Sequence, residues 1–243
     1  MSSLPRTTKP GFFADSLLLK ILFGAIIASA LLHIIWQLIV GPWDPLRFDL
    51  LMDIAMRFGL DNELSVPTWL VSAMALATSG VLWLIGRHTT ASKLLWYVLA
   101  ALFAVIAIDE TAALHELVVQ GVHVGVGLGD QQTFTSNAWL LLAPLIFAAG
   151  IWLVVWLHRS LPSKTFWRIA IALGVYVGGA FFVEYLSIQI DKADLMYRIG
   201  LVVLEETMEM LGVWLALRAA LLHIREQLPD LQSLITRVVY PKR

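Results

Sequence analysis

Acidic and histidine side chains recur at close spacing inside three strongly apolar stretches of the chain. They are Asp109, Glu110, His115 and Glu116 in the first, Glu184 in the second, and Glu205, Glu206 and Glu209 in the third. A charged side chain costs about 2.5–3.5 kcal/mol at the centre of a membrane helix, so a group of them indicates a functional site. Carboxylates that lie close together repel one another, and they retain a proton or bind a cation.

Helical geometry predicts which of these side chains share a face. At about 100° per residue, Asp109, His115 and Glu116 fall on one face about 120° wide, whereas Glu110 points elsewhere, as a contact for another helix would. The same calculation places a second set on one stripe of the last apolar stretch: Arg198, Glu205, Glu206 and Glu209. His33 lies at similar depth in the first apolar stretch, as a further candidate ligand or as a buried histidine bonded to another helix.

Carboxylate and imidazole ligands without sulfur are typical of Fe, Mn and Zn sites, and the chain has no cysteine. The candidate metal ligands are His33, Asp109, His115, Glu116, Glu184, Glu205, Glu206 and Glu209. Of these, Glu116 and Glu209 are the candidate catalytic residues, because either carboxylate could bridge metal ions or act as a base. The Glu-x-x-His pair of dimetal bundles is missing, so the pattern selects no particular metal.

Neither haem nor a nucleotide is expected as a cofactor. The glycine-rich stretch 121–129 lacks the Lys and the Ser or Thr of a phosphate-binding loop. We therefore expect one or more divalent metal ions as the only cofactor.

Positioning these residues requires helices that cross a membrane. The chain is 59% hydrophobic and 14% charged, against about 25% charged in a typical soluble domain. A hydrocarbon core of about 30 Å takes roughly 20 helical residues. Six stretches are long enough: residues 17–40, 67–85, 94–117, 138–157, 166–188 and 195–223. The sequence thus predicts an all-α integral membrane protein with a single six-helix domain over residues 1–243.

The basic residues predict the orientation of these spans. Thirteen Lys and Arg fall on the side of the two termini and four on the other side, so the positive-inside rule places both termini in the cytoplasm. The acidic and histidine group then lies toward the extracytoplasmic side, and His88, His158 and His223 are expected near the cytoplasmic interface, exposed to solvent. Gly174 and Gly178 form a small-residue step that predicts a close helix crossing.

Two amphipathic segments predict helices that lie on the membrane surface. Residues 46–58 would lie on the outer interface, and residues 229–240 on the cytoplasmic interface. The second segment combines an apolar stripe with Arg237, Lys242 and Arg243, which suits contact with anionic lipid or with a partner protein.

Several motifs together resemble a family of bacterial multi-pass membrane proteins of unassigned function. They are the stretch Asp61–Trp69, a DExxxxHE pattern over Asp109–Glu116, Gly178–Ala180 followed by Glu184, and an LEExxEMLG pattern over Leu204–Gly212. The resemblance implies a multi-pass membrane fold and draws attention to the acidic residues. It implies no particular activity.

The leading hypothesis is a metal-binding protein of the bacterial inner (cytoplasmic) membrane. It could be an oxidoreductase or hydrolase acting on a small or lipid-like substrate at the outer face, and whether it is an enzyme stays open. The alternatives are a proton- or cation-coupled transporter that uses the same acids, or a non-catalytic subunit of a membrane complex. Expected partners are membrane lipid and another membrane protein or a second copy. A net charge of −1 gives no indication of nucleic acid.

Overall fold

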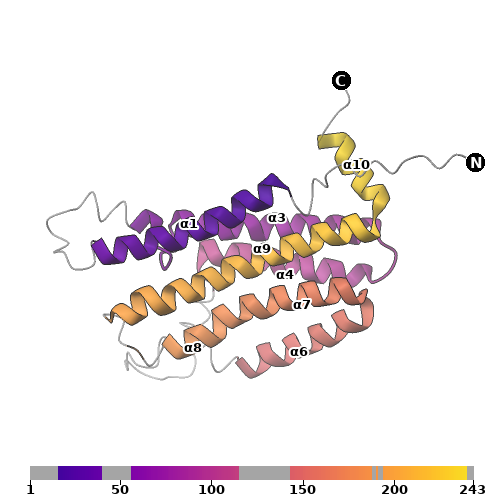
Figure 1. Cartoon of the computed structure of the whole chain (residues 1–243). Helices are drawn as coiled ribbons and strands as arrows, with labels where there is room; N and C mark the ends of the chain where they lie inside the picture. Colours follow the sequence, from indigo (N-terminus) through magenta and orange to yellow (C-terminus); the bar gives the residue numbers. More distant parts are fainter. Residues whose placement is uncertain (1–15, 40–55, 115–142, 188–189, 191–193, 240–243) are drawn as a thin grey trace, which may run out of the picture.

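The computed structural model describes residues 16–39, 56–114, 143–187, 190 and 194–239, and every regular element within those ranges is helical (Figure 1). The elements are α1 (Leu17–Ile39), α3 (Val66–His88), α4 (Lys93–Ala112), α6 (Ala143–Ser160), α7 (Ser163–Val177), the π-helix η3 (Gly178–Val183), α8 (Glu184–Ser187), the π-helix η4 (Met196–Leu201), α9 (Val202–Gln227) and α10 (Pro229–Val239). The prediction of an all-α protein is confirmed for this part of the chain.

Four helical segments are long and apolar enough to cross a membrane: Leu17–Leu38, Val66–His88, Lys93–Ala112 and Ser163–Ser187. They correspond to four of the six predicted spans and support a membrane protein. The predicted span 138–157 corresponds to α6, whose apolar part is shorter. The last predicted span corresponds to α9 with the π-helix η4 before it, and it carries the acidic residues.

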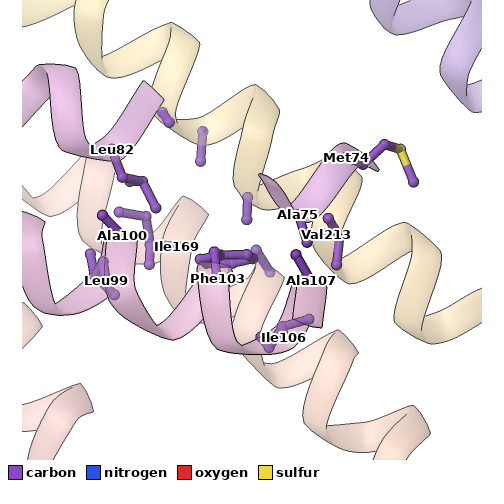
Figure 2. Packing of buried hydrophobic residues seen from close by; sticks show 14 of the residues in the cluster. Met74, Ala75, Leu82, Leu99, Ala100, Phe103, Ile106, Ala107, Ile169 and Val213 are labelled. Carbon is purple, nitrogen blue, oxygen red and sulfur yellow. The ribbon is translucent and has the colours of Figure 1, made fainter. Parts of the chain in front are cut away.

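Helix α9 occupies the middle of the bundle and contacts α1, α3, α7, η3, η4 and α10 (Figure 1). Helix α6 packs beside α7 at the edge. Figure 2 shows the apolar core between these helices, where small residues such as Ala75, Ala100 and Ala107 lie beside larger ones such as Phe103 and Ile169. Small residues let helix backbones approach closely, which is the usual basis of helix association in membranes.

Helices α3 and α4 form an antiparallel hairpin joined by two hydrogen bonds from serine side chains. Ser72 Oγ donates to the Ala107 carbonyl and Ser79 Oγ to the Ala100 carbonyl, both at 2.7 Å. The two serines are two helical turns apart, so both lie on the same face of α3. Each hydroxyl is thus satisfied within the pair, as an apolar surrounding requires.

The start of α3 is specified by its local sequence. Ser65 Oγ accepts a hydrogen bond from the Thr68 amide at 3.2 Å, which satisfies one of the free amides of the first turn. Pro67 follows within the first turn, where its missing N–H costs nothing. The Thr68 hydroxyl also donates to the Asn62 carbonyl at 2.9 Å, which connects the start of α3 to the turn that follows Leu60 and Asp61.

The predicted close crossing involves Gly178 but not Gly174, because a Cβ on Gly178 would lie 2.9 Å from Met208 Cε of α9. A Cβ on Gly174 would meet no atom within 4 Å, whereas one on Gly179 would lie 2.8 Å from the Glu205 carbonyl oxygen. On α9, a Cβ on Gly212 would lie 2.7 Å from the backbone nitrogen of Tyr176. The Gly174–Gly178 step is therefore only half used, and Gly179, the second residue of the π-helix η3, approaches α9 more closely than Gly174 does.

At the opposite end of the bundle, the environment of His223 differs from the one predicted. His223 is buried rather than solvated, its Nδ1 lies 3.0 Å from Thr165 Oγ1, and its ring packs on Trp96 at 4.6 Å between centroids. His88 and His158 are exposed, as expected. The predicted helix at 229–240 is confirmed as α10, whereas the predicted helix at 46–58 lies largely outside the described residues and the glycine-rich stretch 121–129 entirely outside them.

Candidate carboxyl cluster

Acidic residues of α4 and α9 come together at one end of the bundle. Glu110 lies in the last turn of α4, and its carboxyl group shares a hydrogen bond with that of Glu209 on α9. Two carboxyl groups share a hydrogen bond only when one of them carries a proton, because a carboxylate has no hydrogen to donate. Tyr176 of α7 donates from its hydroxyl to Glu110 Oε1 at 3.3 Å. Three helices thus contribute to one hydrogen-bonded chain.

Glu205 and Glu206 extend this group along α9. Electrostatic interactions connect Glu206 to Glu110 and Glu205, and Glu209 to all three of them. The three glutamates of α9 are half-buried. We call Glu110, Glu205, Glu206 and Glu209 the carboxyl cluster.

Two π-helices contact α9, the helix that carries most of the carboxyl cluster. In η3, Gly179 packs directly on α9, where an added Cβ would lie 3.2 Å from Glu209 Cγ. The second π-helix, η4, leads into α9 a few residues before Glu205. π-helical turns are rare and occur frequently at functional sites. Here η3 brings the backbone of Gly179 against the helix that carries most of the acids.

Helix α4 ends inside the stretch over which Asp109, His115 and Glu116 are predicted to share a face, and the common face itself stays a prediction. Helix α4 ends at Ala112, and Ala113 has φ 45, in the left-handed region, with its amide donating to the Asp109 carbonyl at 2.8 Å. The rotation of about 100° per residue therefore stops at Ala113. His115 and Glu116 lie outside the described residues.

Glu110 was expected to point away from the ligand face and toward another helix. Its contacts with Tyr176 and Glu209 confirm the second part and add Glu110 to the acidic group. Asp109, one residue earlier, is half-buried and interacts electrostatically with Tyr176. Glu184 begins the short helix α8 directly after η3.

His33 is a buried histidine held by the chain that precedes α3. It is 1% exposed, and its Nδ1 accepts a hydrogen bond from the Leu60 amide at 3.1 Å. That bond occupies Nδ1, so any metal ion would have to bind through Nε2. Leu60 adjoins Asp61, which interacts electrostatically with Glu206. His33 therefore belongs to the same end of the bundle as the carboxyl cluster.

The sequence reasoning missed two contributors. Tyr176 gave no signal, because a tyrosine in an apolar stretch is ordinary. Asp61 belongs to the motif Asp61–Trp69, and its place in the turn before α3 is a signal, because that turn adjoins the end of the bundle that carries Glu206.

The described residues supply only part of a metal site. No group of three or more His, Asp or Glu among them is arranged to hold a metal ion. Thr207 Oγ1, within the same stretch of α9, is buried and has no hydrogen-bond partner in the described part of the chain. At about 100° per residue, Thr207 lies on the side of α9 opposite Glu205 and Glu209, so this hydroxyl is not part of the carboxyl cluster.

The fold and the cluster define a class: an all-helical protein with membrane-type helices and a group of acids at one end. The chain belongs to the family described as a domain of unknown function, DUF8692, whose model matches residues 22–224. No curated protein and no solved structure is significantly similar to the chain. The match covers most of the chain, including every member of the carboxyl cluster, and agrees with the resemblance to a family without an assigned activity.

Proposed function

We propose that this protein is a multi-span integral membrane protein that binds a divalent metal ion at its carboxyl cluster. The observation that supports the proposal is the contact between Glu110 and Glu209, with Glu206 beside them. Acids at the end of apolar helices are costly unless their charge is compensated. In the absence of metal a shared proton compensates it, and a divalent cation would replace that proton.

Six spans with both termini in the cytoplasm fit the distribution of charge in the bundle. The acids of α4 and α9 lie at one end. Basic residues such as Arg87, Lys93, Arg159 and Lys164 lie at the ends of α3, α4, α6 and α7 that are remote from the cluster. By the positive-inside rule that basic end is cytoplasmic. The cluster would then face the outer side of a bacterial inner membrane.

His115 and Glu116 are proposed to complete the ligand set, because the described carboxyls alone are not arranged around an ion. Mixed carboxylate and imidazole ligands suit Fe, Mn or Zn. Such an ion would supply Lewis acidity for activating water or oxygen, and Glu209 or Glu116 would take up the proton. A substrate of small or lipid-like character could approach from the bilayer, as an oxidoreductase or hydrolase would need.

The proposal is tested by elemental analysis of protein purified in detergent without added metal. We compare the wild type with Glu110→Gln and Glu209→Gln, which keep the side-chain size and remove the charge. The matched control is Glu63→Gln, an exposed acid in the turn before α3. We expect stoichiometric metal in the wild type and control and a loss in both cluster variants. Metal that is substoichiometric, or unchanged in Glu110→Gln and Glu209→Gln, would refute the proposal.

A proton-coupled transporter is the second candidate, and the hydrogen-bonded chain of Tyr176, Glu110 and Glu209 favours it. Such a chain can pass a proton between α7, α4 and α9. Against it, the described core between the cluster and the basic end is dominated by apolar residues such as Phe103, Ile106 and Val213. Proton flux in proteoliposomes that is abolished by Glu209→Gln, in a protein without bound metal, would select this function.

A non-catalytic subunit of a membrane complex is the remaining alternative. It predicts that Glu110→Gln and Glu209→Gln leave assembly with a membrane-protein partner intact, in a protein with neither bound metal nor proton flux. Size-exclusion chromatography of the protein extracted in mild detergent, for the wild type and both variants, measures this.

A further inference from the structure

A shallow groove of about 650 Å³ runs between α3 and α4 on the outside of the bundle. Trp83 and Tyr97 line it, together with the small residues Gly80, Ala101 and Ala104. A Cβ on Gly80 would meet no atom within 4 Å. The groove exists because a glycine and two alanines lie beside two aromatic side chains.

The serine hydroxyl in the wall of the groove is already hydrogen-bonded. Ser79, which also lines it, donates its hydroxyl to the Ala100 carbonyl at 2.7 Å. Both α3 and α4 are among the helices long and apolar enough to span a membrane, and Gly80 and Trp83 are exposed. In a bilayer this groove therefore opens toward lipid chains.

Two cationic side chains lie over the rings of these aromatic residues, at one end of the groove. The Arg87 guanidinium lies 5.0 Å from the centre of the Trp83 ring, and Lys93 Nζ lies 5.8 Å from that of Tyr97. Such cation–π contacts hold a positive side chain in place. Both side chains are exposed, and neither forms an ion pair with a described residue.

The dimensions match one leaflet of a membrane. From Leu76, at the far end of the groove, to Arg87 is eleven residues of α3, or about 16 Å at about 1.5 Å per residue. That is close to half of a hydrocarbon core of about 30 Å. The cations thus lie at the level of the headgroups when the groove lies beside the chains.

We propose that this groove binds one anionic phospholipid from the leaflet at the basic end of the bundle. An acyl chain would lie over Gly80 between Trp83 and Tyr97, and the phosphate would contact Arg87 and Lys93. Arg and Lys are the residues that bind phosphate best. Arg donates two parallel N–H hydrogen bonds from its planar guanidinium, and Lys contributes a compact positive charge. A helix of a second copy in the groove would leave both cations without an anion, so charge complementarity favours the lipid.

The test is native mass spectrometry of the detergent-purified full chain titrated with phosphatidylglycerol or with phosphatidylcholine of the same acyl chains. Gly80→Leu fills the groove and should lower the affinity for both lipids. Arg87→Gln with Lys93→Gln should lower the affinity for phosphatidylglycerol only, by about 25-fold, from about fivefold for each cation. Wild-type protein should bind one phosphatidylglycerol more tightly than phosphatidylcholine.

Matched controls separate the groove from general effects. Gly150→Leu adds the same side chain to α6, where a Cβ also meets nothing within 4 Å. Arg159→Gln with Lys164→Gln removes two exposed cations at the same end of the bundle. Both controls should bind lipid as the wild type does, and the thermal unfolding of every variant is compared first.

Three results would overturn the proposal. The first is phosphatidylglycerol binding that is unchanged in the folded Arg87→Gln/Lys93→Gln protein. The second is an equal loss of binding in the Arg159→Gln/Lys164→Gln control. The third is a dimer that dissociates in Gly80→Leu while lipid binding persists, which would identify a second copy as the occupant. The double charge variant changes only exposed side chains, so it decides the question even if Gly80→Leu does not fold.

Discussion

Replacing Gly212 with alanine should loosen the crossing between α7 and α9. The new Cβ would lie 2.7 Å from Tyr176 N and Cβ and 2.8 Å from its Cα. Ordinary van der Waals contact begins at 3.4 Å, so α7 has to retreat by about 0.7 Å, the difference between the two distances. Backbone atoms cannot move aside as a flexible side chain can, so the whole crossing must shift.

The free-energy change follows from two opposing effects. Overpacking of this kind costs about 1–3 kcal/mol. Alanine in place of glycine inside a helix gains up to about 1 kcal/mol through helix propensity. Gly174→Ala makes the same exchange on α7 where a Cβ meets nothing within 4 Å, so it has the propensity gain alone. The difference in unfolding free energy between the two variants should therefore be about 1–3 kcal/mol.

Equilibrium unfolding in mixed micelles measures that difference. A second effect is expected at the carboxyl cluster, because the hydrogen bond from Tyr176 to Glu110 is already long at 3.3 Å and breaks when α7 retreats. If Gly212→Ala is as stable as Gly174→Ala, the close crossing does not limit stability and the reasoning is wrong. Gly150→Ala on α6 is a second control, because a Cβ there also meets nothing within 4 Å. Its unfolding free energy should change as that of Gly174→Ala does.

Three further outcomes are expected from substitutions elsewhere. Arg168 donates two hydrogen bonds of 2.9 Å to Glu226, which lowers the pKa of the Glu226 carboxyl. The ion pair therefore stabilises the fold at pH values above the usual glutamate pKa, and this stability is lost as the pH falls through the lowered pKa. Glu226→Gln removes the pair, so the loss of unfolding free energy at acidic pH, measured as a stability–pH profile, should become smaller. The change should be under about 1 kcal/mol, because the pair is partly exposed. His33→Leu leaves the Leu60 amide without its buried acceptor and should cost about 1–3 kcal/mol in chemical unfolding. Thr165→Val removes the hydroxyl bonded to a buried histidine nitrogen and should cost about 1–2 kcal/mol in the same assay.

The sequence by itself determined the helical class and the positions of the main helices. Long apolar stretches have to be helical in a membrane, because backbone groups there find partners only within the helix. The predicted spans 17–40 and 67–85 differ by a few residues from α1 and α3. The acidic residues in these stretches could also be recognised as a candidate site from the sequence. A charged side chain in a membrane helix costs free energy, so it is rarely present without a functional role.

Only the tertiary structure decided which acids meet. Angular position on an ideal helix separated Glu110 from Asp109, but side-chain contacts between helices join Glu110 of α4 to Tyr176 of α7 and to Glu209 of α9. A left-handed residue at Ala113 and a π-helix at Gly178 each interrupt the regular rotation of about 100° per residue. A periodicity argument assumes an uninterrupted helix, so it does not reveal where the rotation changes.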